Sequence, residues 1–199
     1  MSAHLFADDV LFLQRVLQCC GLYTARLDGI WGPKTDAAVN EFERLTEEIA
    51  ARHGRFDPGS ERRIPSLMPK AQEAARIFLH QVLDAGIPAR IISGTRTYEE
   101  QNALYRKGRF GNPGPIVTKA RGGFSNHNFG IAWDIGIFDN GRYLGESPLY
   151  DQAGDVASVP GVEWGGNWRT FQDRPHYQLA TGKRITAVRE SFESGVAFV

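Results

Sequence analysis

Two short segments of the chain carry the side chains that a hydrolytic zinc site requires. The first contains His127 and Asp134, and the second contains Asp173 and His176. In zinc hydrolases, three protein ligands leave one position for a water molecule, whose pKa falls to about 7. We therefore predict that His127, Asp134 and His176 bind zinc and that Asp173 acts as the general base.

The sequence around these residues favours such a site. Gly130 permits a tight turn ahead of Asp134. Residues 131–137 alternate in the manner of a β-strand, which places Asp134 on a face with two small residues and leaves room for a metal. Pro175 restricts the backbone before His176 and fixes the approach of that side chain.

Other titratable residues are weaker candidates. His4 lies in the terminus, His53 in a polar linker and His80 on a predicted helix, so structural or solvent-exposed roles are favoured for them. Glu163 competes for the role of general base, but it lies farther along the chain from the second histidine of the site than Asp173 does.

These motifs together resemble a known family. The pattern Ser-x-His-x-x-Gly-x-Ala-x-Asp at 125–134 is followed by Trp-Gly-Gly-x-Trp at 164–168 and Asp-x-Pro-His-Tyr at 173–177. This combination closely resembles the zinc peptidases of the D-Ala-D-Ala carboxypeptidase/VanY group, and within it the phage L-alanyl-D-glutamate endopeptidases. The resemblance covers roughly residues 65 to 180.

The resemblance implies an α+β fold of the D-Ala-D-Ala peptidase/hedgehog-like type, with a small antiparallel sheet, flanking helices and a Zn²⁺ site. It assigns zinc to His127, Asp134 and His176, and base catalysis to Asp173. Cleavage of the peptidoglycan stem peptide is the implied activity. The short Asp at the base position fits the endopeptidase branch better than the carboxypeptidase branch, which favours the L-Ala–D-Glu bond.

Four further residues are candidates for substrate binding or catalysis. In the family, the segment that corresponds to 93–101 lines the substrate cleft, so Arg96 is expected to bind a substrate carboxylate or to stabilise the oxyanion. Gln101 on the following helix is a weaker candidate. Ser125 and Trp168 are candidates for substrate contact, with a structural hydroxyl and a core aromatic as the respective alternatives.

The N-terminal part of the chain resembles the small peptidoglycan-binding domain found beside many wall hydrolases. Residues 8–20 are predicted to form an amphipathic helix capped by Asp8 or Asp9, and a second helix begins at Pro33 and runs to about residue 50. Trp31, in the turn-rich loop between them, is predicted to fill a small helical core.

These features predict three segments, which are a helical module at 1–50, a linker at 51–64 and a catalytic domain at 65–199. Within the last, we expect helices at 69–85, from 98 onward and at 148–159, a strand at 89–93, a hairpin turn at 139–142 and a peripheral tail at 185–199.

Composition limits the class of protein. The chain has 199 residues, with 23 acidic and 23 basic side chains, which argues against electrostatic binding to nucleic acid or anionic lipid. Its apolar runs are too short for membrane insertion, and the N-terminus lacks the basic region of a signal peptide. The adjacent Cys19 and Cys20 exclude a disulfide framework and a thiolate zinc site.

We therefore expect a monomeric zinc metallopeptidase that is made in the cytoplasm and acts on bacterial peptidoglycan, as a phage or prophage endolysin or a secreted effector. Two alternatives stay open. One is a D-Ala-D-Ala carboxypeptidase, and the other is a non-catalytic wall-binding protein with structural zinc.

Overall fold

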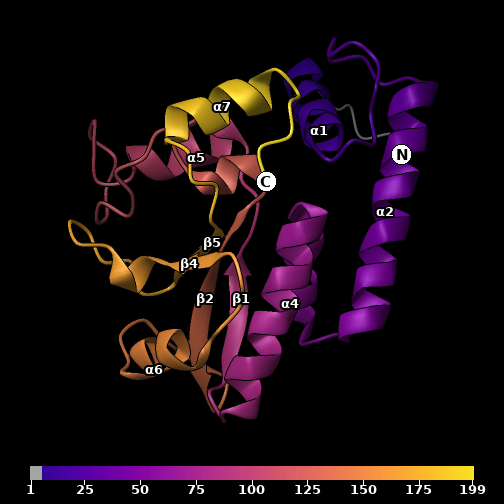
Figure 1. The fold of residues 1–199 in the computed structure, drawn as a ribbon. Helices are drawn as coiled ribbons and strands as arrows, with labels where there is room; N and C mark the ends of the chain where they lie inside the picture. Colours follow the sequence, from indigo (N-terminus) through magenta and orange to yellow (C-terminus); the bar gives the residue numbers. More distant parts are fainter. Residues whose placement is uncertain (1–5) are drawn as a thin grey trace. The chain divides into compact units, whose positions relative to one another are not determined.

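The computed structural model describes residues 6–199, so His4 and the start of the chain lie outside the described part. The chain divides into two compact units. Unit 1 contains the N-terminal residues up to Arg44, the segment Arg96–Phe129 and the segment Thr181–Phe198. Unit 2 contains Leu45–Thr95 and Gly130–Ala180. Helices and an antiparallel sheet confirm the predicted α+β class (Figure 1).

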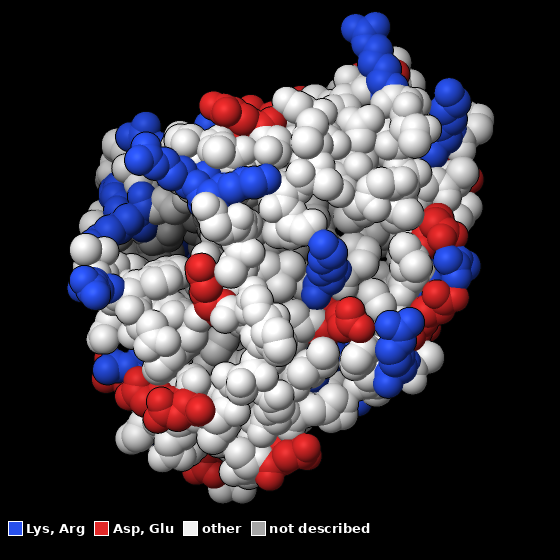
Figure 2. All heavy atoms as spheres, viewed as in Figure 1, with Lys and Arg blue, Asp and Glu red and all other residues white. Residues whose placement is uncertain are grey.

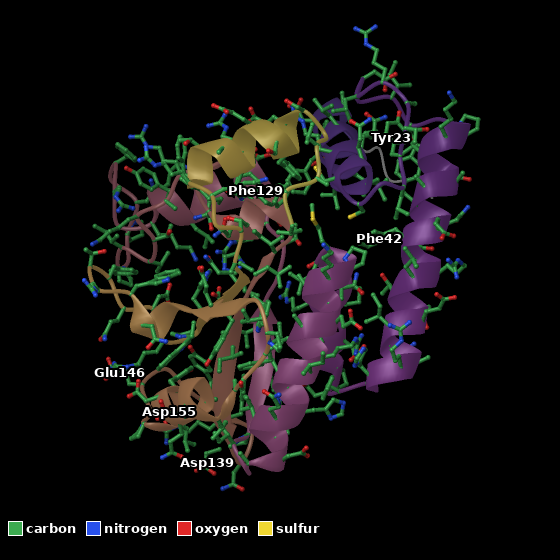
Figure 3. All side chains as sticks on the ribbon, viewed as in Figure 1. Tyr23, Phe42, Phe129, Asp139, Glu146 and Asp155 are labelled. Atoms are coloured by element: carbon green, nitrogen blue, oxygen red, sulfur yellow. The ribbon has the colours of Figure 1, made fainter. Side chains whose placement is uncertain are left out.

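The N-terminal part of unit 1 is helical. Helix α1 spans Ala7–Cys19, and α2 spans Pro33–His53, of which residues 33–44 belong to unit 1. Leu17, Tyr23 and Ala38 are buried at the centre of this module, and Phe42 packs against them. Figure 3 labels Tyr23 and Phe42. Apolar residues at helical spacing thus bury one face of each helix. Two expectations were wrong for this module, one on capping and one on Trp31.

Helix α1 begins after Phe6, which makes no side-chain capping bond, so the predicted caps Asp8 and Asp9 lie instead in the first turn. Their negative charges interact favourably with the positive N-terminal end of the helix dipole. Trp31 is 41% exposed rather than buried in the helical core. The loop is therefore held by another residue.

That residue is Gln14, whose side chain is fully buried. Its Oε1 accepts hydrogen bonds from the backbone N–H groups of Asp28 (3.0 Å) and Gly29 (2.9 Å). Its Nε2 donates to the carbonyl of Ile30 at 3.0 Å and to Tyr23 Oη at 3.2 Å. One carboxamide therefore fixes the whole loop between the two helices.

The substitution Gln14→Leu is expected to leave these buried loop amides without an acceptor, at a cost of roughly 1–3 kcal/mol. Amide hydrogen exchange at residues 28 and 29 should accelerate accordingly. Gln18→Leu is the matched control, because the Gln18 amide donates to the Ala25 carbonyl at 3.1 Å rather than bonding to residues 28–30. Equal exchange rates in the wild type and the Gln14 variant would contradict the assignment.

The rest of unit 1 contains α5 (Tyr98–Arg106), the short helix η2 (Asn126–Phe129) and α7 (Ile185–Glu193). Helix α5 begins with a capping box, in which the Thr97 side chain accepts from the Glu100 N–H and the Glu100 side chain accepts from the Thr97 N–H. The C-terminal segment is not a peripheral tail. Phe192 of α7 is fully buried, and its ring lies 5.3 Å from that of Phe129 and 5.4 Å from that of Phe12.

Unit 2 is built on the sheet (Figure 1). Its strand order is β1-β2-β5-β4, all antiparallel, with β3 paired to β2. The strands are β1 (Ala89–Ser93), β2 (Ala132–Asp139), β3 (Arg142–Leu144), β4 (Val162–Trp164) and β5 (His176–Leu179). The helices are α3 (Pro58–Glu61), η1 (Ile64–Ser66), α4 (Pro69–Asp84), α6 (Leu149–Val156) and η3 (Gly165–Asn167).

Helix α4 packs on the sheet through aromatic side chains. Phe78 of α4 lies 4.3 Å from the ring of Tyr177 and 6.1 Å from that of Trp133. Trp133 and Tyr177 are partners across β2 and β5. Because side chains alternate along a strand, the next pair in register, Asp134 and His176, points to the opposite face. The aromatic layer thus fixes which face carries the polar pair.

Residues 51–64 are structured rather than an extended connection. Helix α2 continues to His53, and Asp57 caps α3 by accepting bonds from the N–H groups of Gly59 and Ser60. The hydroxyl of the buried Ser60 also accepts a bond from the N–H of Ile91 in β1, at 2.9 Å. The predicted domain boundaries themselves stay a prediction.

The β2–β3 turn is the predicted hairpin, with Asn140 and Gly141 both at positive φ. Among residues 6–199, no helix combines the length and apolar character needed to cross a bilayer. Figure 2 shows acidic and basic side chains together on one face of the molecule, in keeping with their equal numbers.

Candidate functional site

Asp134 and His176 form the polar centre of unit 2. They are register partners on β2 and β5, and His176 Nδ1 lies 3.1 Å from Asp134 Oδ1. His176 is only 6% exposed. The sheet therefore brings a carboxylate and an imidazole from distant parts of the sequence into direct contact.

The second ring nitrogen of His176 has its own partner. Nε2 lies 2.9 Å from Gln178 Oε1, and Gln178 Nε2 donates to Glu163 Oε2 at 2.9 Å. Burial acts to lower the pKa of His176, but the hydrogen bonds that its ring donates to Asp134 and Gln178 and the negative charge of Asp134 outweigh it and raise that pKa. The site thus favours positive charge at this imidazole.

His127 is the third potential ligand. It lies on η2, is 1% exposed, and is followed by Gly130 at φ +69°, the turn that the sequence predicts ahead of β2. One ligand atom from each of His127, Asp134 and His176 lies within 4.8 Å of the others. Two imidazoles and one carboxylate match the donor set of catalytic zinc sites, so these residues could hold a metal ion.

Asp173 is held beside His176 by a close backbone approach to Gly165. The Asp173 N–H donates to the Gly165 carbonyl at 3.0 Å, and the His176 N–H donates to the Asp173 carbonyl at 3.1 Å. A Cβ atom on Gly165 would lie 2.5 Å from the Asp173 carbonyl oxygen and 3.2 Å from His176 Cβ. Only glycine leaves enough space for this segment.

We expect Gly165→Ala to displace the segment 173–176 and to lower zinc affinity by roughly 10–100-fold, as the loss of a supporting contact typically does. Competition with a chromophoric chelator would measure the change. The control is Gly145→Ala, where the added Cβ makes an ordinary 3.6 Å contact with Tyr143. Unchanged affinity in the Gly165 variant would show that the loop adjusts without moving the ligand.

A cavity of about 550 Å³ opens beside Asp173 within unit 2. Arg174 on its wall pairs with Asp151, with Nε 2.7 Å from Oδ1. Its lining combines acidic, basic and small residues: Gly145, Glu146, Ser147, Pro148, Tyr150, Asp151, Gln172, Asp173, Arg174 and Pro175. The cavity has the volume and polarity to take part of a peptide.

The predicted residues of unit 1 lie near His127 along the backbone. The Arg96 N–H donates to the His127 carbonyl at 3.0 Å, and the Ser125 carbonyl accepts a bond from the Asn128 N–H at 2.9 Å. Gln101 is fully buried, and its amide donates to Ala120 O (3.0 Å) and Thr118 Oγ1 (3.3 Å). Gln101 therefore anchors the loop after α5, and its contact with substrate stays a prediction.

Trp168 lies against the site, with its ring 5.0 Å from that of His176. Trp164 instead stacks on Tyr177, with ring centroids 6.4 Å apart, and its indole N–H donates to the Arg174 carbonyl, so its role is structural. Phe171, which follows Trp168 by three residues, is 49% exposed.

Sequence reasoning missed two supporting residues. Asn128 is fully buried, its Nδ2 donates to the Arg96 carbonyl at 2.9 Å, and its Oδ1 accepts from the Gly123 N–H at 2.9 Å. It joins the segment carrying His127 to the segment carrying Arg96. Gln178 was the second, although its place two residues after a predicted ligand on a strand could have indicated it.

Comparisons with known proteins identify the relatives of this chain. Residues 118–179 match a peptidase family model described as D-alanyl-D-alanine carboxypeptidase, and residues 7–46 match a putative peptidoglycan binding domain. The chain is 36% identical over 128 residues to the peptidoglycan L-alanyl-D-glutamate endopeptidase CwlK of Bacillus subtilis, covering 58% of this chain and 75% of CwlK. It is also similar to the crystal structure of the Serratia marcescens L-Ala D-Glu endopeptidase ChiX, with a TM-score of 0.51 and 26% identity over 66% of this chain and 94% of ChiX.

Proposed function

Because the chain belongs to the M15 peptidase family, we propose that it is a zinc-dependent endopeptidase that cuts the peptidoglycan stem between L-alanine and D-glutamate. The observation that carries the proposal is the grouping of His127, Asp134 and His176 within 4.8 Å, with Asp173 hydrogen-bonded through its backbone to His176.

The three grouped residues would hold the metal. A zinc ion there would polarise the substrate carbonyl and lower the pKa of water. Asp173 accepts the proton of the attacking water and returns it to the departing amine nitrogen. Arg96 stabilises the oxyanion or binds a substrate carboxylate, and Ser125 and Trp168 contact the substrate.

The choice of scissile bond rests on two relatives. CwlK and ChiX are both named as L-alanyl-D-glutamate endopeptidases. Asp173 at the base position agrees with that branch. The description of the matching family model favours the alternative of a D-Ala-D-Ala carboxypeptidase.

The proposal extends to the N-terminal module, which matches a putative peptidoglycan binding domain. Ile30 and Trp31 are 68% and 41% exposed on its loop, so an apolar surface is available to a glycan strand. A wall-binding module and a peptidase on one chain also support a lytic role for the protein, as an endolysin or a secreted effector.

Incubation of the zinc-loaded chain with a defined disaccharide pentapeptide tests the proposal. Mass spectrometry should detect disaccharide-L-alanine and a tetrapeptide that begins with D-glutamate. Release of terminal D-alanine alone would establish the carboxypeptidase alternative. Binding to purified sacculi without any new amino group would instead favour the wall-binding protein with structural zinc.

A further inference from the structure

We propose that Gln178 and Glu163 form a relay that positions His176 for the metal, with Gln178 as the positioning residue. The inference rests on the proposed metal site. It assigns a role to the side of the imidazole that faces away from Asp134, and it gives Glu163 a function other than that of a competing base.

The backbone places the three side chains together. His176 and Gln178 are two residues apart on β5, so both side chains point to the same face of the sheet. Glu163 on β4 is the register partner of Gln178. Side chains of directly opposed residues on one face lie within contact distance. Two strands therefore deliver a continuous row of glutamate, glutamine and histidine.

The chemistry of the row fixes every proton in it. A carboxylate only accepts hydrogen bonds, so the group of Gln178 that faces Glu163 Oε2 at 2.9 Å must be the amide nitrogen. The amide oxygen of Gln178 must then face His176 Nε2, which lies 2.9 Å away. Because that oxygen only accepts, Nε2 must carry the hydrogen.

The consequence falls on the other nitrogen of the ring. With the hydrogen on Nε2, the neutral imidazole presents the lone pair of Nδ1 toward Asp134 Oδ1, 3.1 Å away. A lone pair and a carboxylate oxygen at this distance repel each other unless a proton or a metal ion lies between them. The relay therefore keeps the hydrogen on Nε2, so that Nδ1 and Asp134 can converge as two ligands when a metal ion replaces the proton between them. Metal-binding histidines are commonly oriented by such a partner on the second nitrogen.

The test compares zinc affinities of the full chain by chelator competition. Gln178→Leu removes the acceptor for Nε2–H and should weaken zinc binding by roughly 10–100-fold. The double variant Glu163→Gln with Gln178→Glu exchanges the two side chains. The carboxylate at position 178 then accepts from His176 Nε2–H, and the amide at position 163 donates to that carboxylate, so zinc affinity should return to within a few-fold of the wild type. Gln152→Leu on the exposed surface of α6 is the matched control.

Nitrogen NMR of labelled His176 gives a readout that does not depend on affinity. In the zinc-loaded chain, the wild-type imidazole of His176 should carry its hydrogen on Nε2. In the metal-free chain, the Gln178→Leu variant should no longer hold a hydrogen on Nε2 in preference to Nδ1. A hydrogen on Nδ1 in the loaded wild type would overturn the relay. Zinc affinity within about two-fold of the wild type in Gln178→Leu would also overturn it.

Both readouts are independent of substrate, so failure of the relay and failure of the proposed function are distinguishable. A chain that shows the relay and binds zinc but leaves the muropeptide intact refutes only the peptidase. A chain that cleaves the muropeptide while Gln178→Leu keeps full zinc affinity refutes only the relay.

Discussion

Asp173→Asn is expected to lower kcat for muropeptide cleavage by roughly 10²–10⁴-fold while zinc affinity stays near the wild-type value. Asparagine keeps the size of the side chain and the backbone bonds to Gly165 and His176, but it cannot accept a proton from water. The loss should therefore appear in kcat and not in metal content. Single-turnover kinetics with equal zinc occupancy would measure it.

Three variants separate this role from others. His127→Ala should lose both zinc and turnover, and Asp155→Asn, an exposed carboxylate on α6, should keep both. Glu163→Gln should lower turnover only through zinc occupancy, so saturating zinc should restore it. Full activity of Asp173→Asn, combined with a loss in Glu163→Gln that zinc does not restore, would transfer the role of base to Glu163.

The residues of the candidate site could be proposed from the sequence because they lie in short motifs, and their roles stay a prediction. The spacing around His127 and Asp134 and around Asp173 and His176 carried the resemblance to the M15 peptidases, and the family membership confirms it. The alternating side-chain pattern of residues 131–137 predicted which face of the strand Asp134 occupies. The pairing of β2 with β5 then places Asp134 opposite His176.

Burial that depends on tertiary packing was not predictable in the same way. Trp31 has a large apolar side chain of the kind usually found in a core. The buried Gln14 holds its loop instead, and the indole is 41% exposed. The C-terminal segment reads as a tail, yet Phe192 is fully buried against Phe129. Neither contact has a local sequence signal, because the partners lie far apart along the chain.

Residues 51–64 also make a long-range contact that the local sequence does not indicate, and this contact is expected to contribute more to the stability of the fold. Their polar composition predicts a linker, but Glu61 in this stretch pairs with Arg76 of α4, whose side chain is completely buried. The contact is bidentate, with Arg76 Nη1 2.8 Å from Oε1 and Nη2 3.0 Å from Oε2. Arg76 Nη1 also donates to the Gly54 carbonyl at 2.8 Å. A charged stretch can therefore be part of the folded unit when its charge has a buried partner.

Glu61→Gln is accordingly expected to destabilise the chain by roughly 3–5 kcal/mol at pH 7, because it leaves the Arg76 guanidinium buried without a counter-charge. Denaturant unfolding would measure the loss. Glu41→Gln is the matched control, since the Glu41–Arg44 pair is exposed and a surface pair contributes little. Replacing both partners, with Glu61→Gln and Arg76→Met, should recover much of the lost stability, because no buried charge then remains unpaired.

The same pair predicts a dependence on pH. Burial acts to raise the pKa of Glu61, but the hydrogen bonds from Arg76 and the Phe56 N–H and the positive charge of Arg76 and Arg55 outweigh it and lower that pKa. A carboxyl whose pKa is lower in the folded state stabilises the fold above its unfolded pKa of about 4.3. That contribution disappears as the pH falls through the folded pKa. The free energy of unfolding of the wild type should therefore exceed that of Glu61→Gln at pH 5 and above, and this difference should disappear in strongly acidic solution. A difference that stayed constant down to about pH 2 would show that the carboxylate charge is not what stabilises Arg76.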